Sequence, residues 1–299
     1  MNALELEQVT KRFTTVTAVD ELSLAVPAGC VYGFLGPNGA GKTTTLRMVM
    51  GIIYPDAGTL RVLGSPSADA VKDRLGYLPE ERGLYRKMKV GEILYYLGVI
   101  KGVPRNELRA RIDRWLDTVE LSGWRNRRVE ELSKGMQQKL QFAATMIGEP
   151  ELLILDEPFG GLDPLNVDLM IELILDFKRQ GRTIIFSTHV MEQAEKLCDY
   201  LLLINKGRKV VDGTLAQIRS RYETQSVLVE ADGDLEFLPS LPMVARVQAN
   251  AHHLEVVLSN GQDSQGLLRA LAERTHVRRF EIKLPSLHDI FIHLVKEDT

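Results

Sequence analysis

The chain has 299 residues, of which 26% are charged and 44% are apolar, and its formal net charge at pH 7 is −3. This balance is ordinary for a globular protein with a hydrophobic core, and it lacks the overall basic field that attracts nucleic acid. The two cysteines, Cys30 and Cys198, do not have the spacing of a metal or redox motif, so we expect reduced thiols in a cytosolic protein.

No apolar run approaches the roughly 20 residues that a membrane-spanning helix needs. The longest apolar segments, such as residues 200–204, have the length of a strand. The N-terminal residues also lack the basic-then-apolar order of a secretory signal. We therefore expect a chain that does not enter a bilayer by itself.

The N-terminal third of the chain predicts mainly strands. Residues 1–30 alternate apolar and polar side chains around a Pro-Ala-Gly turn, which is typical of antiparallel strands. A buried strand, a helix and two more strands are predicted next, over residues 31–35, 44–50, 58–63 and 75–78.

The middle of the chain changes to a helical period. Three helices are predicted at residues 90–101, 105–119 and 133–148. Short apolar runs with helices between them then return at residues 152–155, 183–186 and 200–204. Alternating strands and helices predict an α/β fold with a parallel sheet, into which a mostly helical segment, about 84–150, is inserted.

A domain boundary is predicted near residues 216–226. Beyond it, the pattern predicts three strands and two helices, at residues 227–230, 254–258, 277–282, 264–273 and 287–295. We therefore expect a first domain over 1–218 and a small α+β accessory domain over 219–299, in which we find no chemical motif of its own.

Residues 36–43 follow the G-x-x-x-x-G-K-[ST] pattern that binds polyphosphates. Its glycines let backbone N–H groups turn toward the phosphates, Lys42 reaches the outer phosphates, and the Thr43 hydroxyl is placed for Mg²⁺. A strand is predicted before the pattern and a helix after it, so the helix N-terminus would face the anion. We predict that a nucleoside triphosphate is bound by Gly36, Pro37, Asn38, Gly39, Ala40, Gly41, Lys42, Thr43 and Thr44.

Two carboxylates, Asp156 and Glu157, follow the predicted strand 152–155. Open α/β sheets bind ligands at the carboxyl ends of such strands. We expect Asp156 to hold Mg²⁺, directly or through water, and Glu157 to take a proton from the attacking water or to orient it. His189 follows the next predicted strand. It lies at the same edge if the two strands are parallel, and we then expect it to contact the γ-phosphate.

The segment LSKGMQQ, residues 132–138, begins a predicted helix. Ser133 suits the N-cap position, and a capped helix N-terminus with a glycine nearby is typical of anion sites. By itself, the segment is more typical of an ordinary helix start.

In combination, these motifs resemble the ATP-binding subunit of an ABC transporter. GPNGAGKT and LLILDE stand where that family has its two Walker motifs, LSKGMQQ stands for its LSGGQ signature, and His189 stands for its switch histidine. The match covers roughly residues 1–215 in the family's order and is far more specific than a phosphate loop alone. The resemblance implies an α/β P-loop NTPase parallel sheet, with an N-terminal antiparallel β-subdomain and a helical insertion, and it implies ATP and Mg²⁺ as cofactors.

The resemblance also implies a head-to-tail dimer, in which Ser133 and Gly135 of one subunit meet the γ-phosphate that the other subunit binds. Phe13 stands at the position of an aromatic residue that stacks on adenine, or it is a core residue. Asp163, in the family's D-loop, contacts the partner subunit, or it is only the N-cap of the helix that Pro164 opens.

Two segments depart from the family's pattern. Glu80 stands where the family usually has a glutamine; its carboxylate can approach Mg²⁺ or water, but it adds negative charge near the triphosphate. In the signature, Lys134 replaces a glycine and Met136 replaces a glutamine, and Lys134 is either solvated or helps to attract phosphate. Both departures resemble the exporter-type members called ABC-2. The C-terminal domain resembles one appended in that subgroup, with a role in dimer contact or regulation, or only as a stabilising extension.

We therefore predict a cytoplasmic ATPase, peripheral on the cytoplasmic face of the cell membrane, that drives a separate transmembrane permease, in export. The expected partners are that permease and a second ATP-binding subunit, with membrane contact through the permease only and no nucleic acid. Leu84, Tyr85 and Met88 dock the permease, or they form the core of the insertion.

Two other functions are alternatives to a transporter subunit. One is a soluble ABC-type ATPase that acts on nucleic acid or the ribosome; tandem cassettes, long heptads or zinc-binding cysteines usually mark such proteins, and the sequence has none of them. The other is a nucleotide-gated scaffold with weak hydrolysis, for which Glu80 is the motive.

Overall fold

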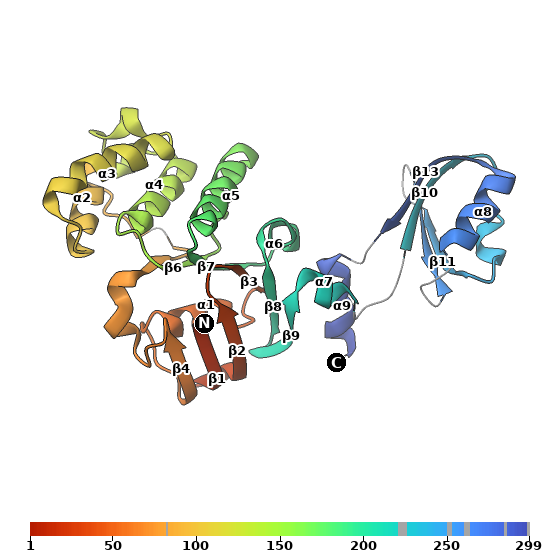
Figure 1. Ribbon diagram of the computed structural model, residues 1–299, viewed down its shortest axis with the longest axis horizontal. Coiled ribbons are helices and arrows are strands. Elements are labelled where there is room, and N and C mark those ends of the chain that lie inside the picture. Colours follow the sequence, from red (N-terminus) through yellow and green to blue (C-terminus); the bar gives the residue numbers. More distant parts are fainter. Residues whose placement is uncertain (82, 221–225, 250–252, 260–263, 284–285, 298–299) are drawn as a thin grey trace. The chain divides into compact units, whose positions relative to one another are not determined.

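The computed structural model describes the chain except for residues 82, 221–225, 250–252, 260–263, 284–285 and 298–299 (Figure 1). It divides into two compact units, Met1–Thr214 and Leu215–Thr299. The division lies just before the boundary expected from the sequence, at 218/219.

A six-stranded sheet forms the centre of the first unit, in the order β5-β6-β7-β3-β8-β9. The first five of these strands pair in parallel, and β9 is an antiparallel edge strand that the sequence pattern does not predict. Every residue of β3, β6 and β7 is buried, which is why these strands read as continuous apolar runs. The strands are β3 (Val31–Leu35), β5 (Leu75–Leu78), β6 (Leu152–Asp156), β7 (Thr183–Thr188), β8 (Tyr200–Asn205) and β9 (Arg208–Thr214).

An antiparallel sheet in the order β2-β1-β4 confirms the expected N-terminal β-subdomain. Its strands are β1 (Asn2–Phe13), β2 (Val16–Pro27) and β4 (Ala57–Val62). Leu4 of β1, Phe34 of β3 and Leu46 of α1 (Lys42–Val49) belong to one buried core. The helix that follows the phosphate loop is therefore fixed by apolar packing with both sheets.

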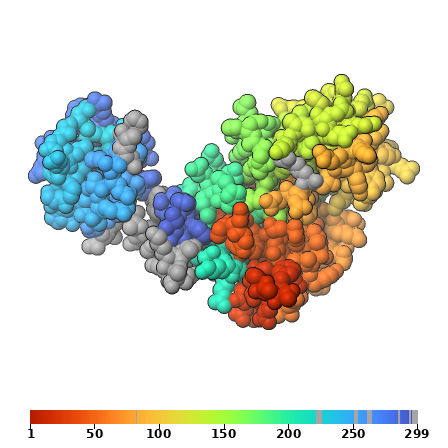
Figure 2. Space-filling view, turned by 180° about the vertical axis from the view of Figure 1, so that it is seen from behind, coloured from red at the N-terminus to blue at the C-terminus, as the bar shows by residue number. Residues whose placement is uncertain are grey.

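The helical insertion has a hydrophobic core of its own. Its helices are α2 (Val90–Ile100), α3 (Arg105–Thr118) and α4 (Lys134–Met146), with short 3₁₀ turns at Ser122–Trp124 and Val129–Glu131. Ile93, Leu108 and Leu140, one from each helix, are fully buried in this core. Figure 2 shows α2 and α3, in orange and yellow, and the red N-terminal strands on one face of the first unit.

Three further elements complete the first unit. The 3₁₀ helix η1 (Ala68–Arg74) leads into β5, and α5 (Pro164–Arg179) and α6 (Met191–Leu197) follow β6 and β7. The alternation of parallel strands and helices that the sequence predicts is confirmed.

The second unit is a small α+β domain, as expected. Its antiparallel sheet has the order β11-β12-β10-β13, and Val229, Val256 and Leu267 lie in its core. Strand β11, whose two valines are three residues apart and do not follow the two-residue period of a strand, is not predicted from the sequence. The elements are α7 (Leu215–Ser220), β10 (Ser226–Asp232), the 3₁₀ turn Leu238–Ser240, β11 (Val244–Ala249), β12 (Leu254–Leu258), α8 (Ser264–Arg274), β13 (His276–Lys283) and α9 (Leu287–Glu297).

Candidate active site

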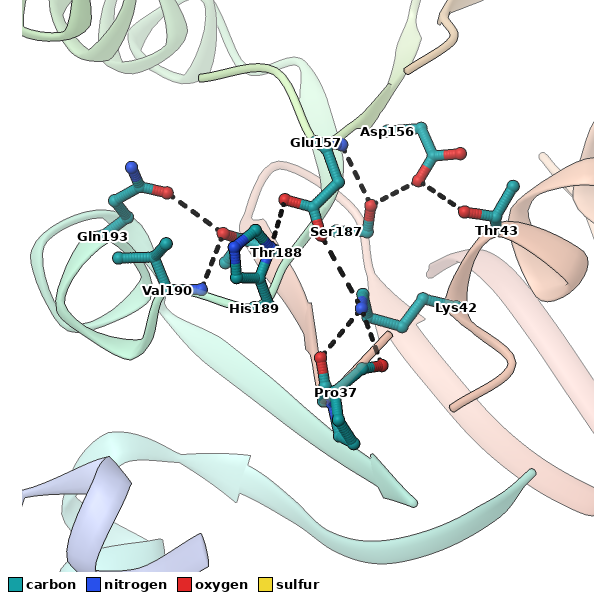
Figure 3. A network of polar contacts seen from close by, with 11 residues as sticks. Pro37, Lys42, Thr43, Asp156, Glu157, Ser187, Thr188, His189, Val190 and Gln193 are labelled. Carbon is teal, nitrogen blue, oxygen red and sulfur yellow. Dashed lines mark hydrogen bonds and ion pairs between the residues drawn. The ribbon is translucent and has the colours of Figure 1, made fainter. Parts of the chain in front are cut away.

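The carboxyl ends of three parallel strands bring the predicted catalytic residues together. Strand β7 pairs in parallel with β3 on one side and with β6 on the other, and Asp156 lies beside Ser187 in this register. The phosphate loop after β3, the carboxylates at the end of β6 and His189 after β7 therefore share one edge of the sheet (Figure 3). The condition on which the prediction for His189 depended, a parallel pairing, is met.

The phosphate loop has a backbone that only glycine accommodates at two positions. Gly41 has φ +106° and stands at the N-cap of α1. A Cβ atom there would lie 2.4 Å from the carbonyl oxygen of Ala18, and one at Gly36 would lie 2.2 Å from that of Ile204. The first N–H groups of a helix lack intrahelical partners and attract anions. The loop therefore places its backbone N–H donors at the N-terminus of α1.

A pocket of about 360 Å³ opens at this loop. Besides the loop, Glu80 and Glu157 line it, as do two residues of β2. The residues in its wall are Val16, Ala18, Asn38, Gly39, Ala40, Gly41, Lys42, Thr43, Thr44, Glu80 and Glu157. It combines backbone donors, one buried lysine and two carboxylates, a composition suited to a polyphosphate with its counterion.

Lys42 is 6% exposed, and its ammonium group points back into the loop. Nζ donates to the carbonyl oxygens of Gly36 at 2.8 Å and Pro37 at 3.2 Å. Oε1 of Glu157 lies 3.6 Å from the same nitrogen. The carboxylate thus supplies the negative charge nearest to Lys42, in the place where a phosphate would compete for it.

Asp156 is 1% exposed, and its two carboxylate oxygens differ in their partners. Oδ1 accepts hydrogen bonds from Thr43 Oγ1 at 3.0 Å and Ser187 Oγ at 2.5 Å. Oδ2 is buried, and no described residue gives it a hydrogen bond. A buried carboxylate oxygen without a donor is costly unless a cation approaches it. Magnesium prefers such hard oxygen ligands and usually takes only one or two protein carboxylates beside phosphates and water, so this donor set fits Mg²⁺.

Glu157 adopts a left-handed backbone conformation, with φ +48°. This is uncommon for a residue with a side chain and is often found where function constrains the chain. Its N–H donates to the carbonyl oxygen of Ser187 at 3.2 Å and to Ser187 Oγ at 3.1 Å. Its Oε2 lies 3.1 Å from Nδ1 of His189, whereas its buried Oε1 has no hydrogen-bond partner in the described part of the chain. The turn aims the carboxylate between Lys42 and His189 (Figure 3).

Ser187, Thr188 and Gln193 belong to the site, although the sequence motifs do not single them out. Ser187 is fully buried and hydrogen-bonds to both Asp156 and Glu157. Thr188 Oγ1 donates to Gln193 Oε1 at 3.0 Å and accepts from Val190 N–H at 3.1 Å, which fixes the turn that carries His189. The only signal in the sequence is that two hydroxyl residues precede His189.

Ser133 and Gly135 do not line the pocket that contains Lys42. Ser133 is exposed at the N-cap of α4, where its Oγ accepts a hydrogen bond from Met136 N–H at 3.2 Å. Asp163 is the N-cap of α5, and Asn166 donates to it through its backbone at 3.0 Å and its side chain at 2.6 Å. These hydrogen bonds lower the pKa of Asp163. Within one chain, Asp163 therefore has the second of the two roles considered for it, that of a helix N-cap.

Phe13 and Glu80 stand at the rim. Phe13 ends β1 and is 50% exposed, so it is not a core residue, and Lys11 Nζ lies 5.7 Å from its ring centroid. Its cross-strand partner Val16 lines the pocket, but Phe13 itself does not. Glu80 is exposed and lines the pocket.

The segment expected to dock a permease is divided between core and surface. Leu84 and Met88 pack against the core of the helical insertion. Tyr85 is 57% exposed, and its ring makes an edge contact with Tyr96 of α2, with centroids 5.9 Å apart. Of the described helices, none is both long enough and apolar enough to cross a membrane.

Comparisons with known proteins agree with this geometry. Residues 19–160 match the ABC transporter family, and residues 213–295 match a family described as the C-terminal domain of DrrA1-3-like ATP-binding proteins. A solved ATP-binding subunit of an ABC transporter superposes with a TM-score of 0.69 at 30% identity, over 74% of this chain and 93% of that one.

Two relatives match over nearly the whole length. The uncharacterized ABC transporter ATP-binding protein YhaQ of Bacillus subtilis is 42% identical over 292 residues, which are 98% of each chain. The Nod factor export ATP-binding protein I of Ralstonia nicotianae is 36% identical over 97% of this chain and 93% of its own length. The chain therefore belongs to the ABC transporter family, as an ATP-binding subunit that hydrolyses ATP in transport.

Proposed function

We propose that two ATP-binding subunits, two copies of this chain or this chain and a close relative, close over MgATP and reopen after its hydrolysis. The observation that carries the proposal is that the predicted site residues lie in two separate places within one chain. Lys42 and Glu157 line one pocket, and Asp156 and His189 lie beside it in contact with Thr43 and Glu157, whereas Ser133 caps an exposed helix start outside it. A second subunit would supply its Ser133 and Gly135 to the γ-phosphate, as the resemblance to the family implies.

In this function, Lys42 would leave the carboxylate of Glu157 and bind a phosphate of ATP instead. Its ammonium group now lies 3.6 Å from the Glu157 carboxylate, and the γ-phosphate of ATP carries more charge than that carboxylate. When Lys42 turns to the phosphate, Glu157 is left to accept a proton from water. Nucleotide binding thereby prepares the base.

Asp156 and Thr43 would hold Mg²⁺, for which Asp156 Oδ2 is the buried oxygen without a donor in the described structure. The metal ion, when bound, neutralises negative charge on the phosphate oxygens. Glu80, which lines the same pocket, would contact the metal or its water, and its added charge would lower the rate relative to glutamine.

Glu157 would act as the general base, with His189 as the group that orients it. The distance of 3.1 Å between Oε2 and Nδ1 is that of a hydrogen bond. Because His189 is 55% exposed, it remains accessible to a γ-phosphate that enters the pocket. It would therefore sense the phosphate and hold the carboxylate in one orientation.

Membership of the family supports a proposal for the partner and for the place of action. We infer a separate transmembrane permease, with this chain on the cytoplasmic face of the cell membrane and touching the membrane through the permease only. Export is the inferred direction, because a relative is named for export. The net charge of −3 gives no reason to expect a nucleic acid partner.

A cross-linking experiment tests the shared site. Asn38→Cys and Lys134→Cys are placed on two differently tagged Glu157→Gln chains, both positions being exposed. With MgATP, a short thiol cross-linker should join the two tags, because the phosphate loop of one chain faces the signature helix of the other. Arg109→Cys, an exposed position on α3, replaces Lys134→Cys as the control and should not cross-link. Equal cross-linking without nucleotide, or cross-linked products that carry only one of the two tags, would contradict the proposal.

A further inference from the structure

One face of α4 carries three polar side chains that donate to backbone carbonyl groups of the sheet edge. They are spaced three and four residues apart, which places them on the same face of a helix. The bonds run from Gln138 Nε2 to Pro158 O at 3.1 Å and from Gln141 Nε2 to Pro79 O and Glu81 O at 3.3 Å each. Thr145 Oγ1 shares its one proton between Tyr77 O at 3.3 Å and Gln141 O, within the helix, at 2.9 Å.

Gln141 differs from the other two because its partners flank Glu80. The carbonyl groups of Pro79 and Glu81 both accept from its Nε2 atom. The amide cannot be turned over, since that would bring Oε1 against two carbonyl oxygens. Gln141 therefore binds the backbone on both sides of Glu80, and this loop places Glu80 at the nucleotide pocket.

The Gln141 side chain does not use its full hydrogen-bonding capacity in this arrangement. The side chain is 4% exposed, and both of its donor distances are at the long end for N–H···O bonds. Its Oε1 is buried, and none of the described residues donates to it. Buried amide groups usually satisfy both their donor and their acceptor capacity. A shift of the loop can therefore shorten these bonds.

We propose that Gln141 is a positioning residue that couples the Glu80 loop to the signature helix, a role that rests on the proposed nucleotide-gated pairing. Ser133 caps the same helix, about two turns before Gln141. Because a helix moves as a rigid rod over this length, a displacement of the Glu80 loop is carried to Ser133. The position of Ser133, which we propose faces the partner subunit, therefore depends on what the Glu80 loop contacts, and Gln141 provides the link.

The test uses Gln141→Met in the Glu157→Gln chain, because methionine keeps the length and volume but has no amide. Three quantities are compared with those of the parent chain: the melting temperature, the affinity of the monomer for ATP, and the dissociation constant of the ATP-dependent dimer. We expect the melting temperature to fall no further than in the control variant Thr145→Val, the affinity for ATP to be unchanged, and the dimer to be about tenfold weaker, the effect of losing one or two ordinary hydrogen bonds.

Thr145→Val is the matched control. It removes a donor from the same face of α4, but the carbonyls that it releases are that of Tyr77, within β5, and the backbone carbonyl of Gln141, within α4, and neither flanks Glu80. We expect its dimer to be as strong as that of the parent. If Gln141→Met does not fold, Gln141→Asn, which is polar but too short to span both carbonyls, replaces it.

The outcomes separate this inference from the proposed function. If Gln141→Met dimerises as well as the parent, or if Thr145→Val weakens the dimer equally, the coupling role of Gln141 is wrong and the paired site stands. A loss of melting temperature and of monomer affinity for ATP would make Gln141 merely structural. If the parent with Gln141 intact does not dimerise with ATP, the proposed function fails first.

Discussion

Glu157 Oε2 lies 3.1 Å from His189 Nδ1, across two parallel strands that end at the same edge of the central sheet. The other oxygen of this carboxylate faces the ammonium group of Lys42. The Glu157 carboxylate is thus held between Lys42, which we propose binds phosphate, and His189, which we propose senses it. The predictions below test what each of these contacts contributes.

Glu157→Gln should abolish most of the hydrolysis and keep the nucleotide. Loss of a general base lowers the rate by about 10²–10⁴-fold. Glutamine has nearly the same shape, so the phosphate loop and Lys42 should bind ATP as tightly as before. Phosphate release and ATP affinity are measured on the same preparation. Hydrolysis at the rate of the unmodified chain would show that Glu157 is not the base.

His189→Ala should lower kcat more than it changes KM. The substitution removes the hydrogen-bond partner of Glu157 Oε2 but leaves the contacts of Lys42 with its loop. We expect a fall in kcat of about 10²-fold, at the lower end of effects on acid–base groups. His276→Ala, at an exposed histidine of β13, is the control and should have the kinetics of the unmodified chain. A change confined to KM would assign His189 to substrate binding instead.

Ser187→Ala should weaken both the fold and the metal site. Ser187 Oγ donates to Asp156 Oδ1 at 2.5 Å and accepts from the N–H of Glu157 at 3.1 Å. Leaving buried polar groups without a partner costs about 1–3 kcal/mol. Denaturant unfolding measures this loss, and titration with Mg²⁺ at fixed ATP should need a higher concentration for half-maximal hydrolysis. Ser240→Ala, at an exposed serine, is the control; equal stabilities of the two variants would refute the role given to Ser187.

Tyr85→Asp should uncouple the subunit from the proposed permease without slowing its own hydrolysis. Tyr85 is exposed at the surface of the helical insertion and contacts Tyr96 there. A charge at this position opposes the desolvation that an apolar interface needs. Co-purification with the permease measures docking, and hydrolysis by the isolated subunit serves as the control for folding. A complex that assembles with normal affinity would place the docking surface elsewhere.

The two cysteines should react slowly with alkylating reagents in the folded protein. Burial raises the pKa of Cys30 to about 11, and the nearby charge of Asp199 adds to this. Burial also raises the pKa of Cys198. A raised thiol pKa means less thiolate at pH 7 to 8, and the thiolate is the reactive form. Mass spectrometry after iodoacetamide treatment should find little labelling of the native chain and full labelling in denaturant. Rapid labelling of the native chain would contradict the raised pKa of these thiols.

The parts of the fold that the sequence predicts are those with the strongest local pattern. Strands β3 and β6 are continuous apolar runs because both of their faces are buried. Strands β9 and β11 escape prediction because they are partly exposed and carry charged side chains such as Arg208 and Arg246 within short segments. Their strand structure comes from pairing with β8 and β12, which is a long-range effect.

The same division applies to the site. Lys42, Thr43, Asp156 and Glu157 are predicted because each belongs to a contiguous motif with a known chemical role. Ser187 and Gln141 could not be found in this way, since their contacts depend on the register of β6 with β7 and on the packing of α4 over the sheet edge. The role of Ser133 toward a second chain stays a prediction.

The most direct test of the central claim is the mass of the Glu157→Gln chain in solution, measured by light scattering with and without MgATP. The account predicts a monomer without nucleotide and twice that mass with MgATP, and a return to the monomer when Ser133→Arg is added. A chain that binds MgATP and keeps the mass of a monomer at every concentration, both by itself and when mixed with a closely related ATP-binding subunit, would contradict the account.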